Sequence, residues 1–154
     1  MIDFKNIFDS RDLKGYREEL EQEILDNYIV WAENHNDQCE DGQEIEVPDT
    51  YEEIEFIEEE AFIMTCEDTI EELKCIVDFI RELEGYGDFQ YGATIIPEHQ
   101  FEEYQKDFCE EIGVIPNDLP SYIANNIDWT AVAEDLMIDY TTAQYKGQTY
   151  LMRA

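Results

Sequence analysis

Positive charge is scarce in this chain of 154 residues, which holds nine Lys and Arg against 40 Asp and Glu, for a formal net charge of −31. Direct binding of nucleic acid is close to excluded on this ground, because it requires Lys and Arg to neutralise phosphates. Anionic membrane surfaces are disfavoured for the same reason. The partner that this charge favours is basic: a cation, a basic protein, or a protein groove that normally holds DNA.

Long apolar runs and paired cysteines are also missing. No stretch of 18 apolar residues exists, so we expect no membrane-spanning helix. The N-terminus lacks the basic region followed by an apolar one that marks a signal peptide. Cys39, Cys66, Cys75 and Cys109 form no Cys-x-x-Cys pair and have no histidine placed to complete a zinc site. We therefore expect free thiols and a reducing, cytoplasmic location.

Recognisable catalytic and cofactor motifs are absent as well. There is no Gly-x-Gly-x-x-Gly, Walker or Gly-x-Ser-x-Gly motif, and neither His35 nor His99 has nucleophile or metal-ligand spacing around it. An EF-hand aligned on Gly42 fails, because Cys39 takes its third position and Pro48 its twelfth. We predict a protein that is not an enzyme and has no cofactor and no specific metal site. Weak binding of divalent cations by surface acids stays open.

The acids that are present gather in one stretch. Residues 18–73 contain 22 Asp and Glu and no Lys or Arg. Ordinary soluble surfaces mix both signs, because like charges raise the cost of compaction. Acidic disordered segments are poor in aromatic residues, whereas this chain is 44% hydrophobic and 13% aromatic. We interpret the stretch as a folded surface whose role is to be negative.

The apolar spacing predicts an α+β fold that is helix-rich and elongated, with a short C-terminal β-hairpin. We expect an acidic helical region over residues 1–84 and an α+β region over residues 85–154, either as two parts or as one continuous domain. Ser10 is predicted to cap a first helix whose apolar stripe runs from Tyr16 to either Trp31 or Ala32, with fraying by Asn34.

The middle of the chain predicts one short strand and two further helices. Gln43–Val47 alternates and favours the strand, and a capping box at Thr50 opens the second helix. A β alternative for residues 54–64 stays open, because short apolar runs are ambiguous. The clearest helix in the sequence begins at Asp68 and ends before Gly85, which suits the left-handed C′ position.

The C-terminal part alternates between turns and short elements. Residues 86–96 indicate a loop and a short strand, and residues 97–112 a helix closed by a glycine. Asp128 is expected to cap a short helix. Residues 138–152 then form two alternating runs that turn at residues 146–147, the pattern of a hairpin.

The density of charge resembles that of DNA. B-DNA carries one charge per roughly 1.7 Å of axis, so 31 net charges match about fifteen base pairs. Carboxylates on helices can stand in for phosphates and pair with Lys and Arg of a DNA channel. The candidate mimics lie in three sets, on the first helix, on the second helix and on the helix after residue 97: Glu18, Glu19, Glu21, Glu23 and Asp26; Glu52, Glu53, Glu55, Glu58, Glu59 and Glu60; and Asp107, Glu110 and Glu111.

Five short motifs in the last third of the chain form one pattern. They are Phe101-Glu-Glu-Tyr, Glu110-Glu-Ile-Gly, Ile127-Asp-Trp-Thr-Ala-Val-Ala-Glu-Asp-Leu, Asp139-Tyr-Thr and Gly147-Gln-Thr-Tyr-Leu-Met-Arg. Over roughly residues 85–153 this pattern resembles the ArdA-type antirestriction proteins of phages and mobile elements. Members of that family are elongated acidic DNA mimics that occupy the DNA groove of type I restriction–modification enzymes. The resemblance implies the same activity here, in the cytoplasm of a bacterial host, although the first 84 residues do not show the family's usual opening.

Other partners remain compatible with the same residues. An inhibitor of a CRISPR complex, or of another DNA-binding enzyme such as a repair glycosylase, would present the same carboxylates. A protein of another class, an acidic adaptor or chaperone for basic proteins, would need only the charge. A cation buffer is a further alternative. The aromatic C-terminal hairpin is a candidate surface for a homodimer.

Overall fold

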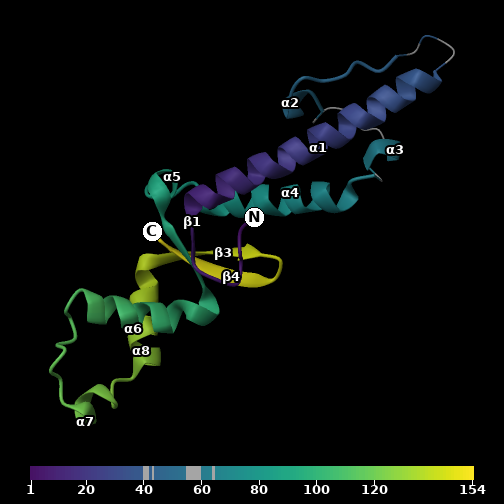
Figure 1. Cartoon of the computed structure of the whole chain (residues 1–154). Coiled ribbons are helices and arrows are strands. Elements are labelled where there is room, and N and C mark those ends of the chain that lie inside the picture. The colour runs from purple at the N-terminus through teal and green to yellow at the C-terminus, as the bar shows by residue number, and fades with distance from the viewer. Residues whose placement is uncertain (40–41, 43, 55–59, 64) are drawn as a thin grey trace. The chain divides into compact units, whose positions relative to one another are not determined.

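The computed structural model of this chain describes residues 1–39, 42, 44–54, 60–63 and 65–154 (Figure 1). The chain is 59% helical with a small antiparallel sheet, which confirms the predicted α+β class. It forms two compact units: residues 14–78, here the helical unit, and residues 1–13 with 79–154, here the sheet unit. The sequence pattern predicted a division after residue 84. In the structure, residues 1–13 and 79–84 belong with the C-terminal part instead.

The helical unit is built on two helices. They are α1 (Ser10–Gln38) and α4 (Glu67–Leu83). The first four residues of α1 and the last five residues of α4 belong to the sheet unit. Within the helical unit the two helices are joined by a hydrogen bond from the Tyr16 hydroxyl to Glu72 of 3.2 Å. The described part of this unit also contains two four-residue helices, α2 (Tyr51–Ile54) and α3 (Glu60–Ile63).

The apolar stripe predicted on the first helix forms the core of the helical unit. Leu20, Ile24, Tyr28 and Ala32 are buried, since a spacing of three to four residues puts them on one face. The ring of Phe62 from α3 packs edge-on against Tyr28, with 4.8 Å between centroids. Burial of each large apolar side chain contributes about 1.5–3 kcal/mol, so this stripe fixes which face of α1 is left for the acids.

The N-terminal cap of α1 is Asp9, so the prediction of Ser10 is wrong by one residue. The Asp9 carboxylate accepts the Arg11 backbone N–H at 2.8 Å, and the Asp12 carboxylate accepts the Asp9 N–H at 3.1 Å, a reciprocal capping box. The Arg11 guanidinium also donates to Asp9, and this hydrogen bond lowers the pKa of the Asp9 carboxyl. Stability from this pair is present above the ordinary Asp pKa and is lost as the pH falls through the lowered one.

The predicted fraying at Asn34 and the predicted strand over residues 43–47 are both wrong in the part of the chain that is described. Helix α1 continues to Gln38, and residues 44–47 form no strand. One side chain explains both outcomes: the Asn36 amide donates to the Ile45 carbonyl at 2.9 Å and accepts the Ile45 N–H at 2.8 Å. The Asn36 side chain therefore forms no turn with its own neighbours. It pairs instead with the N–H and carbonyl of Ile45, the groups that a neighbouring strand would otherwise bind.

The sheet unit contains a four-stranded antiparallel sheet in the order β1-β2-β4-β3. Its strands are β1 (Phe8–Asp9), β2 (Thr94–Pro97), β3 (Tyr140–Tyr145) and β4 (Gln148–Arg153). Strands β3 and β4 confirm the predicted hairpin, and Lys146 and Gly147 have φ of 47° and 78° in its turn. Two left-handed residues suit the twist of such a hairpin.

Each face of this sheet has its own packing. Ile96 and Leu151 pack with Phe101 of α6 (Phe101–Glu111) and Ala133 of α8 (Trp129–Leu136). Because side chains alternate along a strand, Tyr150 points to the other face, where its ring lies 5.3 Å from that of Phe79 at the end of α4. Figure 1 shows α6 and α8 side by side below the hairpin.

The remaining elements are short. They are α5 (Phe89–Gly92), the 3₁₀ helix η1 (Glu98–Gln100), α7 (Ser121–Ala124) and the 3₁₀ helix η2 (Met137–Asp139). The Asp128 cap is confirmed, since its carboxylate accepts the Ala131 N–H at 3.1 Å. Gly113 closes α6 at φ 77° as predicted. Gly85 takes the predicted C′ position after α4, but without a positive φ.

Two further expectations meet the structure. The hairpin residues Tyr145 and Tyr150 are 5% and 1% exposed, so these two rings belong to the core of the sheet unit. Of the alternatives for residues 54–64, residues 55–59 and 64 lie outside the described part of the chain. None of the described helices has both the length and the apolar character that a bilayer crossing needs.

Ser10 joins the start of α1 to α5, and its loss should be costly. Its buried hydroxyl donates to the Phe89 carbonyl at 2.6 Å and accepts the Ala93 N–H at 2.8 Å. Ser10→Ala leaves both backbone groups without this partner, and we expect a loss of about 2–4 kcal/mol in the free energy of unfolding. Urea unfolding measures it, with Ser121→Ala at an exposed position as the control. A loss below about 1 kcal/mol would mean that other groups take over both bonds.

Candidate functional site: an acidic helix face

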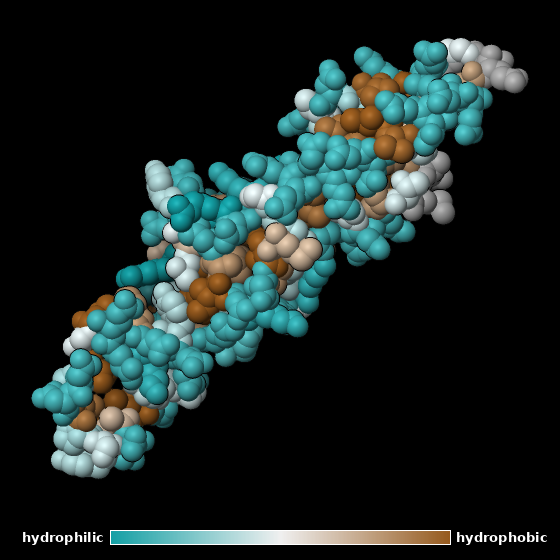
Figure 2. Space-filling model, in the orientation of Figure 1, coloured by the Kyte–Doolittle hydropathy of each residue, from teal (hydrophilic) through white to brown (hydrophobic). Residues whose placement is uncertain are grey.

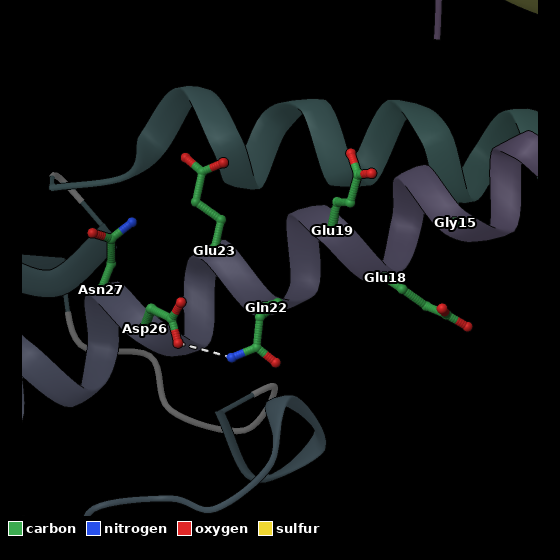
Figure 3. Close-up of a pocket in the computed structure, with 7 residues that line it drawn as sticks. All are labelled: Gly15, Glu18, Glu19, Gln22, Glu23, Asp26 and Asn27. Carbon is green, nitrogen blue, oxygen red and sulfur yellow. Dashed lines mark hydrogen bonds between the residues drawn. The ribbon is translucent and has the colours of Figure 1, made fainter. Parts of the chain in front are cut away.

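Four of the predicted carboxylates on α1 share one face, opposite the buried stripe. Glu18, Glu19, Glu23 and Asp26 are all exposed. Glu19, Glu23 and Asp26 are spaced by four and three residues, which brings their side chains to the same side of the helix, and Glu18 lies at the edge of this side. Together with Gly15, Gln22 and Asn27 they line an open hollow of about 690 Å³ (Figure 3). We name Glu18, Glu19, Glu23 and Asp26 the α1 acidic face.

Neighbouring side chains orient two of these carboxylates. The Asp26 carboxylate accepts the Gln22 amide at 2.8 Å, and the Glu23 carboxylate accepts the Thr69 hydroxyl of α4 at 3.0 Å. Figure 3 shows Glu19 and Glu23 on the side of α4, and Glu18 directed away from it. A carboxylate has about four lone-pair positions, so one such bond holds its direction and leaves acceptor capacity for a basic partner.

Glu21, also predicted as a phosphate mimic, has a different position. The Arg17 guanidinium donates to it at 2.7 Å, and the Glu21 side chain is only 19% exposed. This is an ion pair across one helical turn, on the flank of the buried stripe. Because Arg17 already compensates this charge, we leave Glu21 out of the α1 acidic face.

The second predicted set is described only in part. Glu52 and Glu53 are exposed on α2, and the Glu53 carboxylate accepts the Asp49 N–H at 2.9 Å, so it helps to cap that helix. Glu60 begins α3, but its side chain lies outside what the structure describes. Glu55, Glu58 and Glu59 lie outside the described residues altogether.

The third predicted set is on α6, in the sheet unit. Asp107, Glu110 and Glu111 are all exposed there. Glu103, which the prediction omitted, is exposed too and precedes Asp107 by four residues and Glu110 by seven, a spacing that places the three on one face. The first two sets thus belong to the helical unit and the third to the sheet unit.

Helix α4 supplies acids that the prediction also left out. Glu67, Asp68 and Glu71 are exposed, whereas Glu72 is half-buried and accepts the Tyr16 hydroxyl. Burial, with the nearby Glu72 charge, raises the pKa of Tyr16 to about 12, so this hydroxyl stays a donor at neutral pH. The acids of α4 were visible in the sequence, but only the pairing of α1 with α4 places them in the same unit.

The two units differ in charge. Residues 14–78 hold 23 Asp and Glu against three Lys and Arg, a formal net charge of −20 with histidine neutral. The sheet unit holds the other 17 acids and six Lys and Arg, a net −11. The helical unit therefore carries most of the negative charge, and the α1 acidic face is its best described part.

No group of three or more His, Cys, Asp or Glu in the described part of the chain is placed to hold a metal ion. A separate pocket of about 330 Å³ lies in the sheet unit, where Tyr104, Tyr140, Phe108 and Arg153 contribute to its lining. The lining includes a single carboxylate, Asp88, and no His, Cys or Ser side chain.

Comparison with known proteins adds no relative. No protein family, no curated protein and no solved structure matched this chain. The resemblance to the ArdA type rests on the motifs of the C-terminal third alone. Any functional assignment therefore has to stand on the charged surface.

Gly15, at the edge of the open hollow, offers a simple test of the helix beneath this face. A Cβ added there meets no heavy atom within 4 Å, and glycine inside a helix costs about 0.5–1 kcal/mol relative to alanine. We expect Gly15→Ala to raise the free energy of unfolding by that amount. The contrasting variant is Gly92→Ala, whose φ is 104° and whose Cβ would lie 2.7 Å from the Arg11 side chain. Urea unfolding should show opposite signs for the two variants.

Proposed function

We propose that this protein is a non-enzymatic DNA mimic that occupies the DNA-binding groove of a host defence enzyme. The first target to consider is a type I restriction–modification enzyme. The observation that carries the proposal is the helical unit's net charge of −20, displayed through the exposed carboxylates of the α1 acidic face. The choice of a type I enzyme as the first target follows from the resemblance of the C-terminal motifs to those of ArdA-type proteins.

The spacing of the α1 acidic face suits this role. Its four carboxylates fall between residues 18 and 26, about 12 Å of helix axis at 1.5 Å per residue. One strand of B-DNA carries a phosphate per 3.4 Å, or about 3.5 phosphates over that length. The linear density of charge on this helix face is therefore close to that of a single DNA strand.

The mechanism is competitive. Carboxylates form charge-assisted hydrogen bonds with Lys and Arg, so the acidic faces and the DNA phosphates compete for the same basic groove. Association should be fast at low salt and should weaken steeply as salt rises, because complementary charge mainly raises the association rate. No covalent step and no cofactor is needed.

The deciding experiment is restriction by a purified type I enzyme, with and without this protein, over a titration of DNA. Competitive mimicry gives relief of restriction that fades as the DNA concentration is raised. Relief that is independent of DNA concentration contradicts occupation of the groove. No relief at any ratio removes the restriction enzyme as target and directs the same assay to a CRISPR complex.

A basic protein without a DNA groove tests the adaptor alternative. If this protein binds free histone-like proteins as tightly as it binds the restriction enzyme, at the same salt, the charge acts without groove specificity. A preference for the enzyme of tenfold or more supports mimicry.

A further inference from the structure

The segment between α6 and α8 differs from the rest of the chain in both charge and burial. Residues 112–127, here the α6–α8 connector, include one charged residue, Asp118, although 32% of the whole chain is charged. Half of its sixteen residues are apolar, yet none of the sixteen is buried. Ile112, Val114 and Tyr122 are 55%, 63% and 72% exposed, and Ile123 is 44% exposed.

Local hydrogen bonds shape the turns of this connector. The Ile115 N–H donates to the Cys109 carbonyl at 3.3 Å, and the Leu119 N–H donates to the Pro116 carbonyl at 3.2 Å. The Asn126 side chain donates to the Tyr122 carbonyl at 2.6 Å. In Figure 2 apolar atoms are exposed where this connector runs, at the lower left. Exposed apolar side chains that gather in this way mark surfaces for protein partners.

We propose that the α6–α8 connector docks against an apolar patch on the same basic protein whose DNA groove the acidic faces engage. The inference rests on the proposed function and adds a second, uncharged contact to it. Such a partner offers apolar side chains bordered by Lys and Arg. An apolar centre within a polar rim is the usual anatomy of a protein interface.

Charge selects this occupant over a second copy of the chain. The connector is bordered by exposed acids, Glu110 and Glu111 at the end of α6 and Glu134 and Asp135 on α8. Two copies would bring equal acidic borders together, each on a molecule with a net charge of −31, and like charge opposes association. A basic partner meets the same borders with the opposite sign.

An apolar contact gives the complex what charge alone does not. Ion pairs at a surface weaken as the salt concentration rises. The free energy gained by burying apolar area does not come from ion pairs, so charge screening does not weaken it. DNA offers no counterpart of the connector, so a protein that carries the matching patch is preferred over other DNA-binding proteins. Affinity at raised salt should therefore depend on the connector.

The test is binding of the full chain to a purified type I restriction enzyme over a salt series from about 0.1 to 0.5 M, where charge screening grows. The variant Val114→Ser/Tyr122→Ser/Ile123→Ser should lose about tenfold or more in affinity at every salt concentration, with an unchanged slope against salt. The matched control is Val30→Ser/Ile138→Ser, at positions 57% and 87% exposed outside the connector. It should bind like the wild type. Tyr122→Ser alone serves if the triple variant unfolds.

Three outcomes would overturn the connector proposal. Wild-type binding that the triple variant retains in full overturns the connector as a docking surface and leaves the proposed function standing. Failure of the wild type to bind at the lowest salt removes the type I enzyme as the target, and overturns the connector proposal for that enzyme with it. Sedimentation of the protein alone adds a third result: a dimer that the triple variant dissociates makes a second copy the occupant and overturns the proposal.

Discussion

Reversal of the α1 acidic face is expected to abolish inhibition of the target enzyme. The variant E18K/E19K/E23K/D26K changes the formal net charge from −31 to −23 and turns four attractive contacts into repulsive ones. We expect at least a 100-fold loss of affinity at about 0.1 M salt, since each phosphate-like contact contributes about 0.9 to the salt slope. Single substitutions should have effects below about threefold, because exposed ion pairs are individually weak.

A control variant with the same change in net charge shows whether the position of the reversed carboxylates matters or only the total charge. Reversal of Glu84, Asp88, Glu98 and Asp139, all exposed and outside the predicted sets, also changes the net charge by eight. If only the α1 variant loses inhibition, in a restriction assay and in a direct binding assay, the site is on α1. Equal losses from both variants would contradict a defined face and would favour a purely charge-driven partner.

Neutral substitution supplies a graded version of the same experiment. E18Q/E19Q/E23Q/D26N removes attraction without adding repulsion, and about a tenfold loss is expected because the salt slope falls by up to about four. The third set gives the comparison between units: D107K/E110K/E111K tests whether α6 reaches the same groove. A large loss from both the α1 and the α6 reversals would place carboxylates of both units against the partner.

Local rules predicted the elements whose residues interact with near neighbours. The hairpin followed from alternation and a two-residue turn, and the Asp128 cap from its position before an apolar run. The stripe of α1 followed from helical spacing, and with it the outward direction of its acids. Even the Glu21 ion pair had a local signal, since Arg17 precedes it by four residues.

Most of the errors come from contacts that local patterns do not encode. Strand β1 has two residues and no pattern of its own, and it exists because Phe8 pairs with Ile95. Helix α1 passes through turn-forming residues because Asn36 bonds to Ile45, nine positions later. Thr69 reaches Glu23 from another helix. Such pairings depend on the folded arrangement, which no window of the sequence contains.

Added salt should raise the melting temperature of this protein strongly. The helical unit holds 23 acids against three Lys and Arg, and folding brings these charges closer together than they are in the unfolded chain. Self-repulsion of this kind destabilises the compact state, and the Debye length shrinks from about 30 Å at 0.01 M to about 10 Å at 0.1 M salt. Screening therefore removes a cost that the folded state bears more than the unfolded one.

We expect the melting temperature to rise by about 5–10 °C between 0.01 and 0.5 M NaCl, the shift that about 2–3 kcal/mol produces in a chain of this size. Differential scanning calorimetry or circular dichroism measures it. The E18Q/E19Q/E23Q/D26N variant should melt higher than the wild type at low salt and gain less from added salt. A melting temperature that is flat or falls with salt would contradict concentrated self-repulsion. Because screening depends on ionic strength and not on the identity of the cation, a large rise at micromolar Ca²⁺ or Mg²⁺ would instead identify a specific cation site.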